Sequence, residues 1–253
     1  MNLRTDGITL SINGTNILKG IDSYIESGEF VGLVGPNGSG KSTLLKSIYR
    51  VLKPDSGAIY INEKSLLRMT LKDSAKNMAV VSQFNDFNFD FKVEEIVMMG
   101  RAPHKNKFEL DNMNDHEIVY EALRKVDMIE YVNRNFSTLS GGEKQRIMIA
   151  RALAQQAEVL ILDEPTNHLD IKYQIQLLNL IKSLNKTVFA AIHDLNLAAA
   201  YCDKIYVVKD GKVFVNGTPN DVLTKNNIHK VFGIDVDVIN RGLGEKPYIM
   251  YNL

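Results

Sequence analysis

The first 34 residues alternate between apolar and polar side chains. Asn13-Gly14 separates two apolar series, and Ser27-Gly28 follows the second. A period of two is typical of strands that bury one face, and both dipeptides favour turns. The apolar positions are Ile8, Leu10, Ile12, Ile17, Leu18, Ile21, Tyr24 and Ile25. We therefore expect a partly antiparallel β layer over residues 2–34.

Uninterrupted apolar runs follow and alternate with helical patterns. Such runs are typical of strands that are buried on both faces of a parallel sheet. The strands expected from such runs are Phe30–Val34, Met78–Ser82, Val159–Leu162, Thr187–Ile192 and Ile205–Val208, and a further strand, Ala58–Ile61, follows the turn Pro54-Asp55-Ser56-Gly57. The expected helices are Leu71–Lys76, Ile171–Leu184, Leu195–Cys202 and a helix whose apolar face carries Leu44, Leu45, Ile48, Val51 and Leu52. These patterns predict an α/β fold with a mixed or parallel sheet.

The remaining segments predict how the chain is organised. Helical patterns at Val93–Met99, Asp115–Val126 and Ile129–Asn133 indicate a helical insertion over residues 84–155. Asp210-Gly211 predicts a hairpin into Val213–Val215. We expect one domain, 1–253, in which residues 1–83 and 156–217 form the core with its β layer. Residues 218–253 form a C-terminal extension of two short helices and two strands.

A glycine-rich turn between the first apolar run and the following helix predicts phosphate binding. The spacing Gly35-x-x-x-x-Gly40-Lys41-Ser42 is the P-loop pattern, in which backbone N–H groups and a helix N-terminus surround phosphate oxygens. Lys41 is expected to reach the β- and γ-phosphates, and the Ser42 hydroxyl to bind Mg²⁺. The predicted nucleotide-binding residues are Gly35, Pro36, Asn37, Gly38, Ser39, Gly40, Lys41, Ser42 and Thr43.

Two carboxylates end the apolar run Val159–Leu162. Ligands bind beyond the carboxyl ends of strands in open α/β sheets. We expect Asp163 to hold Mg²⁺ and Glu164 to orient and polarise the water that attacks a γ-phosphate. The alternative is that Asp-Glu-Pro only ends a strand and caps the next helix.

The segment Leu139-Ser140-Gly141-Gly142-Glu143 precedes another helical pattern. Ser140 and Glu143 have the spacing of a capping box, which makes Ser140 the N-cap. A plain cap explains Ser140 and Glu143. It does not explain two adjacent glycines in a first turn, where each costs about 1 kcal/mol relative to alanine. We therefore expect a second phosphate to bind at this helix N-terminus.

Composition narrows the class of protein. Thirty basic residues balance thirty acidic ones, so the charge gives no reason to expect nucleic-acid binding. The single cysteine, Cys202, excludes an internal disulfide and suits a reducing compartment. The N-terminus lacks the pattern of a signal peptide, and no segment approaches 18 consecutive apolar residues. We expect a protein that is neither exported nor membrane-spanning.

Taken together, GPNGSGKST, LSGGEKQR, VLILDEP and the later His193 resemble the nucleotide-binding subunits of ABC transporters over residues 3–233. The resemblance implies an ATPase that uses ATP and Mg²⁺. It also implies a head-to-tail dimer in which ATP lies between the P-loop of one subunit and residues Leu139–Glu143 of the other.

Four further positions take their expected roles from this resemblance. Gln83 corresponds to the glutamine that touches Mg²⁺ or water and senses the membrane partner. His193 corresponds to the histidine that contacts the γ-phosphate, and Asp170 to the aspartate at the dimer interface. The family usually stacks adenine on an aromatic residue, but the matching position here is Ile12. We therefore expect weaker base selectivity, by up to about 1.5 kcal/mol of lost stacking.

FKVEEIVMMGRAPHK, LDEPTNHLDIKYQIQLLNLI and AIHDLNLAAAYCDKIYVVKDGKV are similar to the ATPases of iron–siderophore, haem and cobalamin importers. This implies a subunit that lies peripherally on the cytoplasmic face of the membrane, bound to permease subunits that work with an extracytoplasmic binding protein. The expected permease groove lies between Gln83 and the helical insertion. Its expected residues are Phe84, Phe87, Phe89, Phe91, Val97 and Met98. The aromatic residues could instead belong to the core of the insertion.

The alternative function is that of a soluble ABC ATPase acting on ribosomes or DNA. The sequence NHLD at 167–170 is also similar to such factors. Against this alternative, the chain has one P-loop, no heptad arm and no basic patch.

Overall fold

The computed structural model describes residues 1–253 except 83–89, 107, 168, 240–244 and 253. A six-stranded sheet forms the centre, in the order β10-β9-β3-β8-β7-β6. Its neighbours pair in parallel except for the antiparallel hairpin β9-β10. The strands are β3 Phe30–Val34, β6 Met78–Val81, β7 Val159–Asp163, β8 Thr187–Ala191, β9 Lys204–Lys209 and β10 Lys212–Gly217. The mixed, mainly parallel sheet is confirmed.

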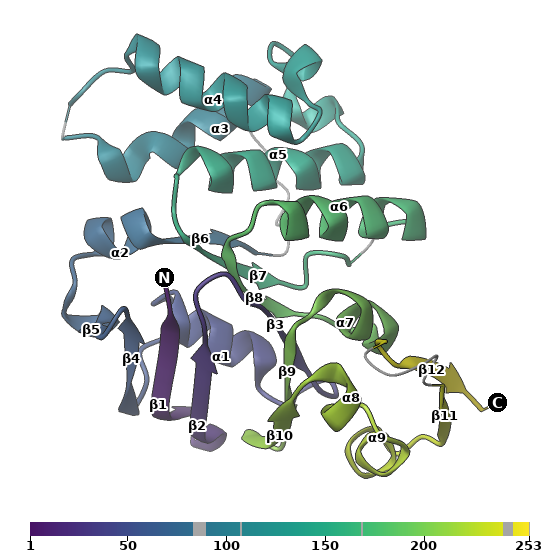
Figure 1. Ribbon diagram of the computed structural model, residues 1–253. Helices are drawn as coiled ribbons and strands as arrows, with labels where there is room; N and C mark the ends of the chain where they lie inside the picture. Colours follow the sequence, from purple (N-terminus) through teal and green to yellow (C-terminus); the bar gives the residue numbers. More distant parts are fainter. Residues whose placement is uncertain (83–89, 107, 168, 240–244, 253) are drawn as a thin grey trace.

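A second, antiparallel sheet has the order β2-β1-β4-β5 and lies beside the central sheet, with the helix that follows β3 between them (Figure 1). Its strands are β1 Leu3–Ile12, β2 Thr15–Ile25, β4 Ser56–Ile61 and the two-residue β5 Lys64–Ser65. The buried residues of β1 and β2 include Ile8, Leu10, Leu18 and Ile21, so the alternating pattern does face a core. This confirms the predicted β layer.

Helices cover both faces of the central sheet. α1 Lys41–Ile48 packs between the central sheet and the β layer, while α6 Ile171–Ser183 and α7 Leu195–Tyr201 lie on the opposite face. The central strands are therefore buried on both sides, and this is why they are apolar without interruption. In β3, Phe30 and Val34 belong to one core cluster, and Val31 and Leu33 to the other.

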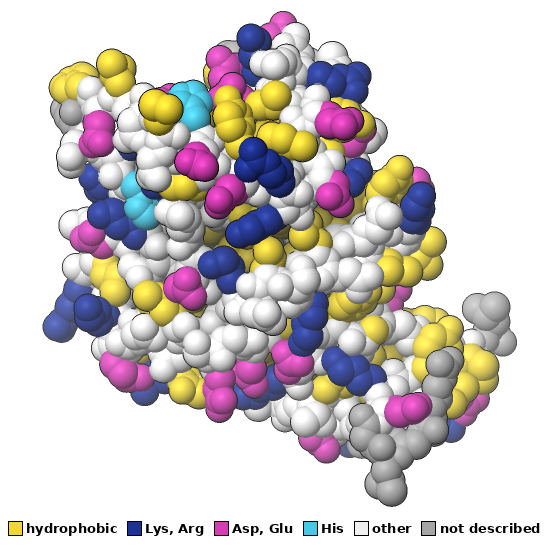
Figure 2. Space-filling model, turned by 45° about the horizontal axis from the view of Figure 1, so that its top comes forward, with side chains coloured by type: hydrophobic (Ala, Val, Ile, Leu, Met, Phe, Trp, Pro, Cys, Tyr) yellow, Lys and Arg dark blue, Asp and Glu magenta, His cyan; other side chains and the backbone are white. Residues whose placement is uncertain are grey.

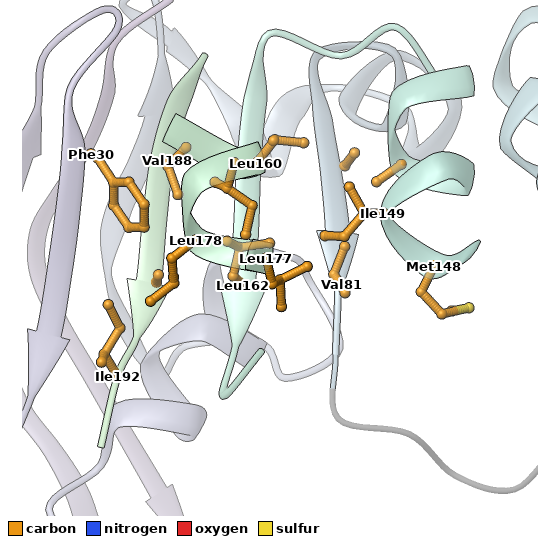
Figure 3. Packing of buried hydrophobic residues seen from close by; sticks show 14 of the residues in the cluster. Phe30, Val81, Met148, Ile149, Leu160, Leu162, Leu177, Leu178, Val188 and Ile192 are labelled. Atoms are coloured by element: carbon orange, nitrogen blue, oxygen red, sulfur yellow. The ribbon is translucent and has the colours of Figure 1, made fainter. Parts of the chain in front are cut away.

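Figure 3 shows the larger of these two cores. Leu177 and Leu178 of α6 lie against Leu160 and Leu162 of β7. Ile149, on the helix that precedes α6 in the chain, lies beside β6. Cys202, which follows α7, is also fully buried, and burial raises the pKa of its thiol to about 12.

The helical insertion stands at one end of the sheet (Figure 1). It contains α3 Val93–Met98, α4 Met113–Lys125 and α5 Gly141–Ala154, with 3-10 turns η2 Met99–His104, η3 Ile129–Tyr131 and η4 Phe136–Thr138. α2 Leu71–Asn77 lies beside it, after the 3-10 turn η1 Leu66–Arg68. Basic and acidic side chains are interspersed over the face that the insertion forms, so charge of one sign does not gather there (Figure 2).

The C-terminal extension contains α8 Pro219–Val222, α9 Lys225–Phe232 and the antiparallel pair β11 Val236–Ile239 and β12 Tyr248–Tyr251. It is tied to α7. Asn196 exchanges hydrogen bonds with the backbone of Ile249, and Lys246 donates to the carbonyls of Ala200 and Cys202. None of the described helices is both long and apolar enough to cross a membrane.

Two expectations for elements were wrong. The helix after the P-loop ends at Ile48 rather than Leu52, and Val51 is 67% exposed. The chain turns at Arg50, whose φ is 66° and whose guanidinium donates to the carbonyl of Met69 at 3.0 Å. The helix expected from Ile129 to Asn133 is only the three-residue turn η3.

Candidate nucleotide-binding site

The P-loop connects β3 to α1 and leaves its amide groups open. Gly35 must be glycine because an added Cβ would lie 2.1 Å from the carbonyl oxygen of Val208. Gly40 is the N-cap of α1 with a φ of 106°, and no side chain caps the helix. The first-turn N–H groups therefore face the loop, where an anion would satisfy them. The buried Ser39 hydroxyl also has no hydrogen-bond partner among the described residues.

The ammonium group of Lys41 lies inside this loop. The residue is only 4% exposed, and Nζ donates to the carbonyl oxygens of Gly35 at 2.7 Å and Pro36 at 3.1 Å. Burial lowers the pKa of Lys41, while the carboxylates of Glu164 and Asp163 act in the opposite direction. A cation held mainly by carbonyl groups can transfer its hydrogen bonds to phosphate oxygens without leaving the loop.

Asp163, at the end of β7, faces the start of α1. The Ser42 hydroxyl donates to Asp163 Oδ1 at 3.0 Å. Burial raises the pKa of Asp163, the hydrogen bond from Ser42 lowers it, and the neighbouring Glu164 raises it again. Oxygen atoms of a hydroxyl and a carboxylate are ligands that suit Mg²⁺, which usually takes one or two protein carboxylates and completes its shell with phosphates and water.

Glu164 has an unusual backbone and two side-chain partners. Its φ is 56°, in the left-handed region that non-glycine residues seldom adopt. Its Oε1 lies 2.5 Å from Nε2 of His193, which follows β8, and its Oε2 accepts a hydrogen bond from Nδ2 of Asn167 at 2.6 Å. The structure thus brings together two residues that the sequence predicted and one, Asn167, to which it gave no catalytic role.

An open pocket of about 470 Å³ joins the P-loop to the turn between β1 and β2. Ile12, with 38% of its surface exposed, lines this pocket together with Glu164. The other lining residues are Asn13, Thr15, Ile17, Asn37, Gly38, Ser39, Gly40, Lys41, Ser42 and Thr43. Sequence analysis missed Asn13, Thr15 and Ile17, although the Asn13-Gly14 turn indicated that the chain reverses there. The P-loop residues form one end of this cleft, which we call the phosphate end, and the aliphatic side chains of Ile12 and Ile17 line the other.

Residues Leu139–Glu143 do not line this pocket. Ser140 is the N-cap of α5, and the capping box is present. Glu143 N donates to Ser140 Oγ at 3.4 Å, and Ser140 N to Glu143 Oε2 at 2.8 Å. The hydrogen bonds from Ser140 lower the pKa of Glu143.

The two glycines of this segment differ. A Cβ on Gly142 would lie 3.3 Å from the ring of Tyr173, a tight contact that a small shift of this partly exposed side chain would relieve. A Cβ on Gly141 would meet nothing within 4 Å, so a lack of space for a side chain does not explain why residue 141 is glycine.

The last two predicted positions are Asp170 and Gln83. Asp170 is exposed at the N-cap of α6, and its side chain makes no capping hydrogen bond. Gln83 lies outside the described residues, as do Phe84, Phe87 and Phe89 of the expected permease groove.

A P-loop that connects β3 of a mainly parallel sheet to a helix, with two carboxylates at the end of another strand of the same sheet, defines a P-loop nucleoside triphosphatase. Residues 18–167 match the model of the ABC transporter family, and the chain belongs to this family. It binds ATP and is an ATPase, as the ATP-binding subunits of ABC transporters are.

Three comparisons describe the chain's relatives. The petrobactin import ATP-binding protein of Bacillus anthracis is 42% identical over 235 residues, which cover 91% of this chain and 86% of that protein. A putative metal-chelate type ABC transporter, solved in an inward-facing conformation, contains a chain that superposes with a TM-score of 0.85 at 26% identity, with 99% and 96% covered. A bacterial ABC transporter cassette solved as a dimer has a TM-score of 0.73 at 30% identity, with 85% and 98% covered.

Proposed function

We propose that this chain is the ATP-hydrolysing subunit of an importer for a metal chelate of the iron–siderophore, haem or cobalamin class. The observation that carries the proposal is the pocket in which the open P-loop amides meet Glu164, itself paired with His193. The cargo class is supported by the relative named for petrobactin import and by the metal-chelate type transporter.

In this proposal, residues 35–43 bind the phosphates of ATP, and Lys41 exchanges its bonds to the loop carbonyls for bonds to phosphate oxygens. Ser42 and Asp163 hold Mg²⁺, together with Gln83, and Mg²⁺ supplies neutralisation of charge on the β- and γ-phosphates. The geometry of Ser42 and Asp163 fits this cation, because their oxygen atoms lie 3.0 Å apart at the phosphate end of the pocket.

Glu164 is the proposed base. A carboxylate at hydrogen-bond distance from an attacking water can take its proton as the bond to phosphorus forms. His193 contacts the γ-phosphate, and this contact requires it to leave Glu164 Oε1. The aliphatic surface of Ile12 carries the adenine ring, so the phosphate end contributes most of the binding.

A second copy of the chain completes each site. The N-terminus of α5 is exposed at Gly141 and lies outside the pocket of its own chain. We propose that residues Leu139–Glu143 close the ATP site of the second copy, and that Asp170 lies at the interface between the copies. The related cassette that was solved as a dimer supports this arrangement.

For the permease we propose a different groove from the one expected from the sequence. Of the residues expected in the first groove, Val97 is fully buried and Phe91 and Met98 are partly buried against the same core, while Phe84, Phe87 and Phe89 lie outside the described residues. A groove of about 380 Å³ instead lies between α2 and η2. It is lined by Tyr49, Leu71, Ser74, Ala75, Met78, Val80, Met99, Gly100, Ala102, Pro103, Arg151 and Gln155.

We propose that this α2–η2 groove receives a short permease helix. Leu71 and Met99, with 69% and 41% of their surface exposed, offer apolar contacts at its rim. Through this contact the chain lies peripherally on the cytoplasmic face of the membrane, and the binding protein acts on it only through the permease.

Glu164→Gln tests the catalytic proposal. The variant should bind ATP, stop turnover and elute as an ATP-bound dimer in size-exclusion chromatography. Glu158→Gln is the control and should behave as wild type, because Glu158 precedes the opposite end of β7 and its side chain is 56% exposed. Turnover at the wild-type rate in Glu164→Gln would exclude Glu164 as the base.

Uptake tests the cargo. Cells that lack the chain should regain transport of a ferric siderophore, haem or cobalamin when the wild-type chain is restored, but not with Glu164→Gln. Restored ATPase activity without uptake of any of the three would contradict the importer assignment.

A further inference from the structure

We propose that Asn167 is a positioning residue that holds the Glu164 carboxylate in its orientation toward the attacking water. The inference rests on the proposed role of Glu164 as the base. Asn167 Nδ2 donates to Glu164 Oε2 at 2.6 Å, while the opposite oxygen, Oε1, lies 2.5 Å from His193 Nε2. The two carboxylate oxygens therefore have different partners.

Glu164 needs such a partner because little else fixes its side chain. Its backbone lies in the left-handed region with a φ of 56°, and the side chain is partly exposed at the pocket wall. Asn167 also donates its backbone N–H to the carbonyl oxygen of Glu164 at 3.2 Å, so residues 164 to 167 form a closed turn. Backbone and side chain of Asn167 together set the direction of the carboxylate.

The loop that carries Asn167 is itself anchored to α6. Gln174 Nε2 donates to the carbonyl oxygens of Thr166 at 3.1 Å and Leu169 at 3.0 Å, on either side of Asn167. Thr166 is only 4% exposed. Asn167 is thus held from α6, the helix whose N-cap, Asp170, is proposed to face the second copy.

The different partners of the two oxygens give them different roles. When His193 moves to the γ-phosphate, Oε1 is released and Oε2 stays bonded to Asn167. As the bond between the water oxygen and the γ-phosphorus forms, the bond from phosphorus to the β-phosphate oxygen breaks, and the water proton passes to Oε1. The Asn167 amide donates an N–H to Oε2 and does not compete for that proton.

Asn167→Asp and Asn167→Ala test this role. Both should lower kcat by about tenfold to a hundredfold, the effect of losing a hydrogen bond to a charged group, with the KM for ATP unchanged. Asp keeps the shape of the side chain but replaces the donor by a carboxylate beside Glu164, whereas Ala removes the donor without adding charge, so the proposal requires kcat to fall in both variants. Wild-type kcat in Asn167→Asp would overturn the proposal, and so would a raised KM with unchanged kcat.

Asn179→Ala is the matched control. Asn179 lies on α6 and makes one side-chain hydrogen bond, from the Tyr201 hydroxyl at 2.9 Å, without contacting Glu164. Its kcat should equal that of wild type. Gln174→Ala is a milder second variant, which loosens the loop but keeps Asn167. It should lower kcat less, and Asn167→Ala/Gln174→Ala should be no slower than Asn167→Ala.

Measuring Asn167→Ala in a chain that also carries Glu164→Gln tells a failure of this inference apart from a failure of the proposed function. There, Asn167→Ala should cause no further loss of the residual turnover, because the two residues act through one carboxylate. If Glu164→Gln stops turnover but Asn167→Ala leaves kcat unchanged in the native background, Glu164 stands as the base and the role of Asn167 is refuted. If Glu164→Gln turns over normally, both fail.

Discussion

Replacing Arg101 with Met should lower the free energy of unfolding by about 3 kcal/mol. Arg101 lies in η2 and bonds this turn to α4 and α5, and it is 5% exposed. Its Nε donates to Asp115 Oδ1 at 3.0 Å, and its Nη1 donates to the carbonyl oxygen of Ala154 at 2.8 Å and to Gln156 Oε1 at 2.9 Å. Met keeps the apolar stem but removes all three hydrogen bonds.

The magnitude follows from what Arg101→Met leaves behind. Removing one partner of a buried ion pair costs about 3–5 kcal/mol, because the other charge stays buried. Asp115, whose side chain is 5% exposed, keeps two weaker donors, the backbone N–H of Asn112 at 3.2 Å and Lys105 Nζ at 3.1 Å. The expected cost therefore lies at the lower end of this range.

Urea unfolding followed by far-UV circular dichroism measures this cost. Lys182→Met is the control, because Lys182 pairs with Asp203 where both side chains are more than 40% exposed, and it should cost less than about 1 kcal/mol. Combining Arg101→Met with Asp115→Asn should recover part of the loss, since no charge is then left buried. A cost below about 1 kcal/mol for Arg101→Met, or strict additivity in the double variant, would refute the reasoning.

Three further predictions concern the acid range, the P-loop and the groove. Burial raises the pKa of Asp115, but hydrogen bonds from its partners outweigh this and lower it to about 2, so its stabilisation is present above about pH 4 and is lost as pH falls toward 2. Asp115→Asn should therefore flatten the loss of unfolding free energy over that window. Lys41→Met should weaken binding of a fluorescent ATP analogue at least about tenfold without changing the circular dichroism spectrum. Leu71→Asp/Met99→Asp should abolish co-purification with the permease but not ATP binding, whereas Phe214→Asp, at a 41% exposed residue of β10, should leave the complex intact.

The sequence predicts those elements whose signals are local. The capping box at Ser140 and Glu143 encodes the start of α5, and the structure shows it. The same kind of signal starts α4 at Met113, where Asn112 and Asp115 form a capping box, although apolar spacing alone placed the start at Asp115. A closer reading of the caps would have found this boundary.

Other features depend on contacts that spacing does not encode. α1 ends where Arg50 reaches the carbonyl of Met69, which lies 19 residues further along the chain. The turn η2 and the α2–η2 groove likewise depend on how two separate segments pack together, so spacing along the chain does not reveal this groove.

The candidate site divides in the same way. Short sequence motifs predict the chemistry of four site residues, which are Lys41, Ser42, Asp163 and Glu164. The bond between Asn167 and Glu164 depends on a left-handed residue, and nothing in the local pattern indicates that conformation.

The burial of Cys202 has a practical consequence for following the chain at work. The only thiol of the sequence is fully enclosed, and burial raises its pKa to about 12, so the reactive thiolate is scarce at neutral pH. A cysteine introduced at an exposed residue such as Asn13, beside the pocket, is then the single labelling site in an otherwise native chain. A fluorophore attached there can report nucleotide arrival and pairing of two copies in real time, without first removing a native cysteine.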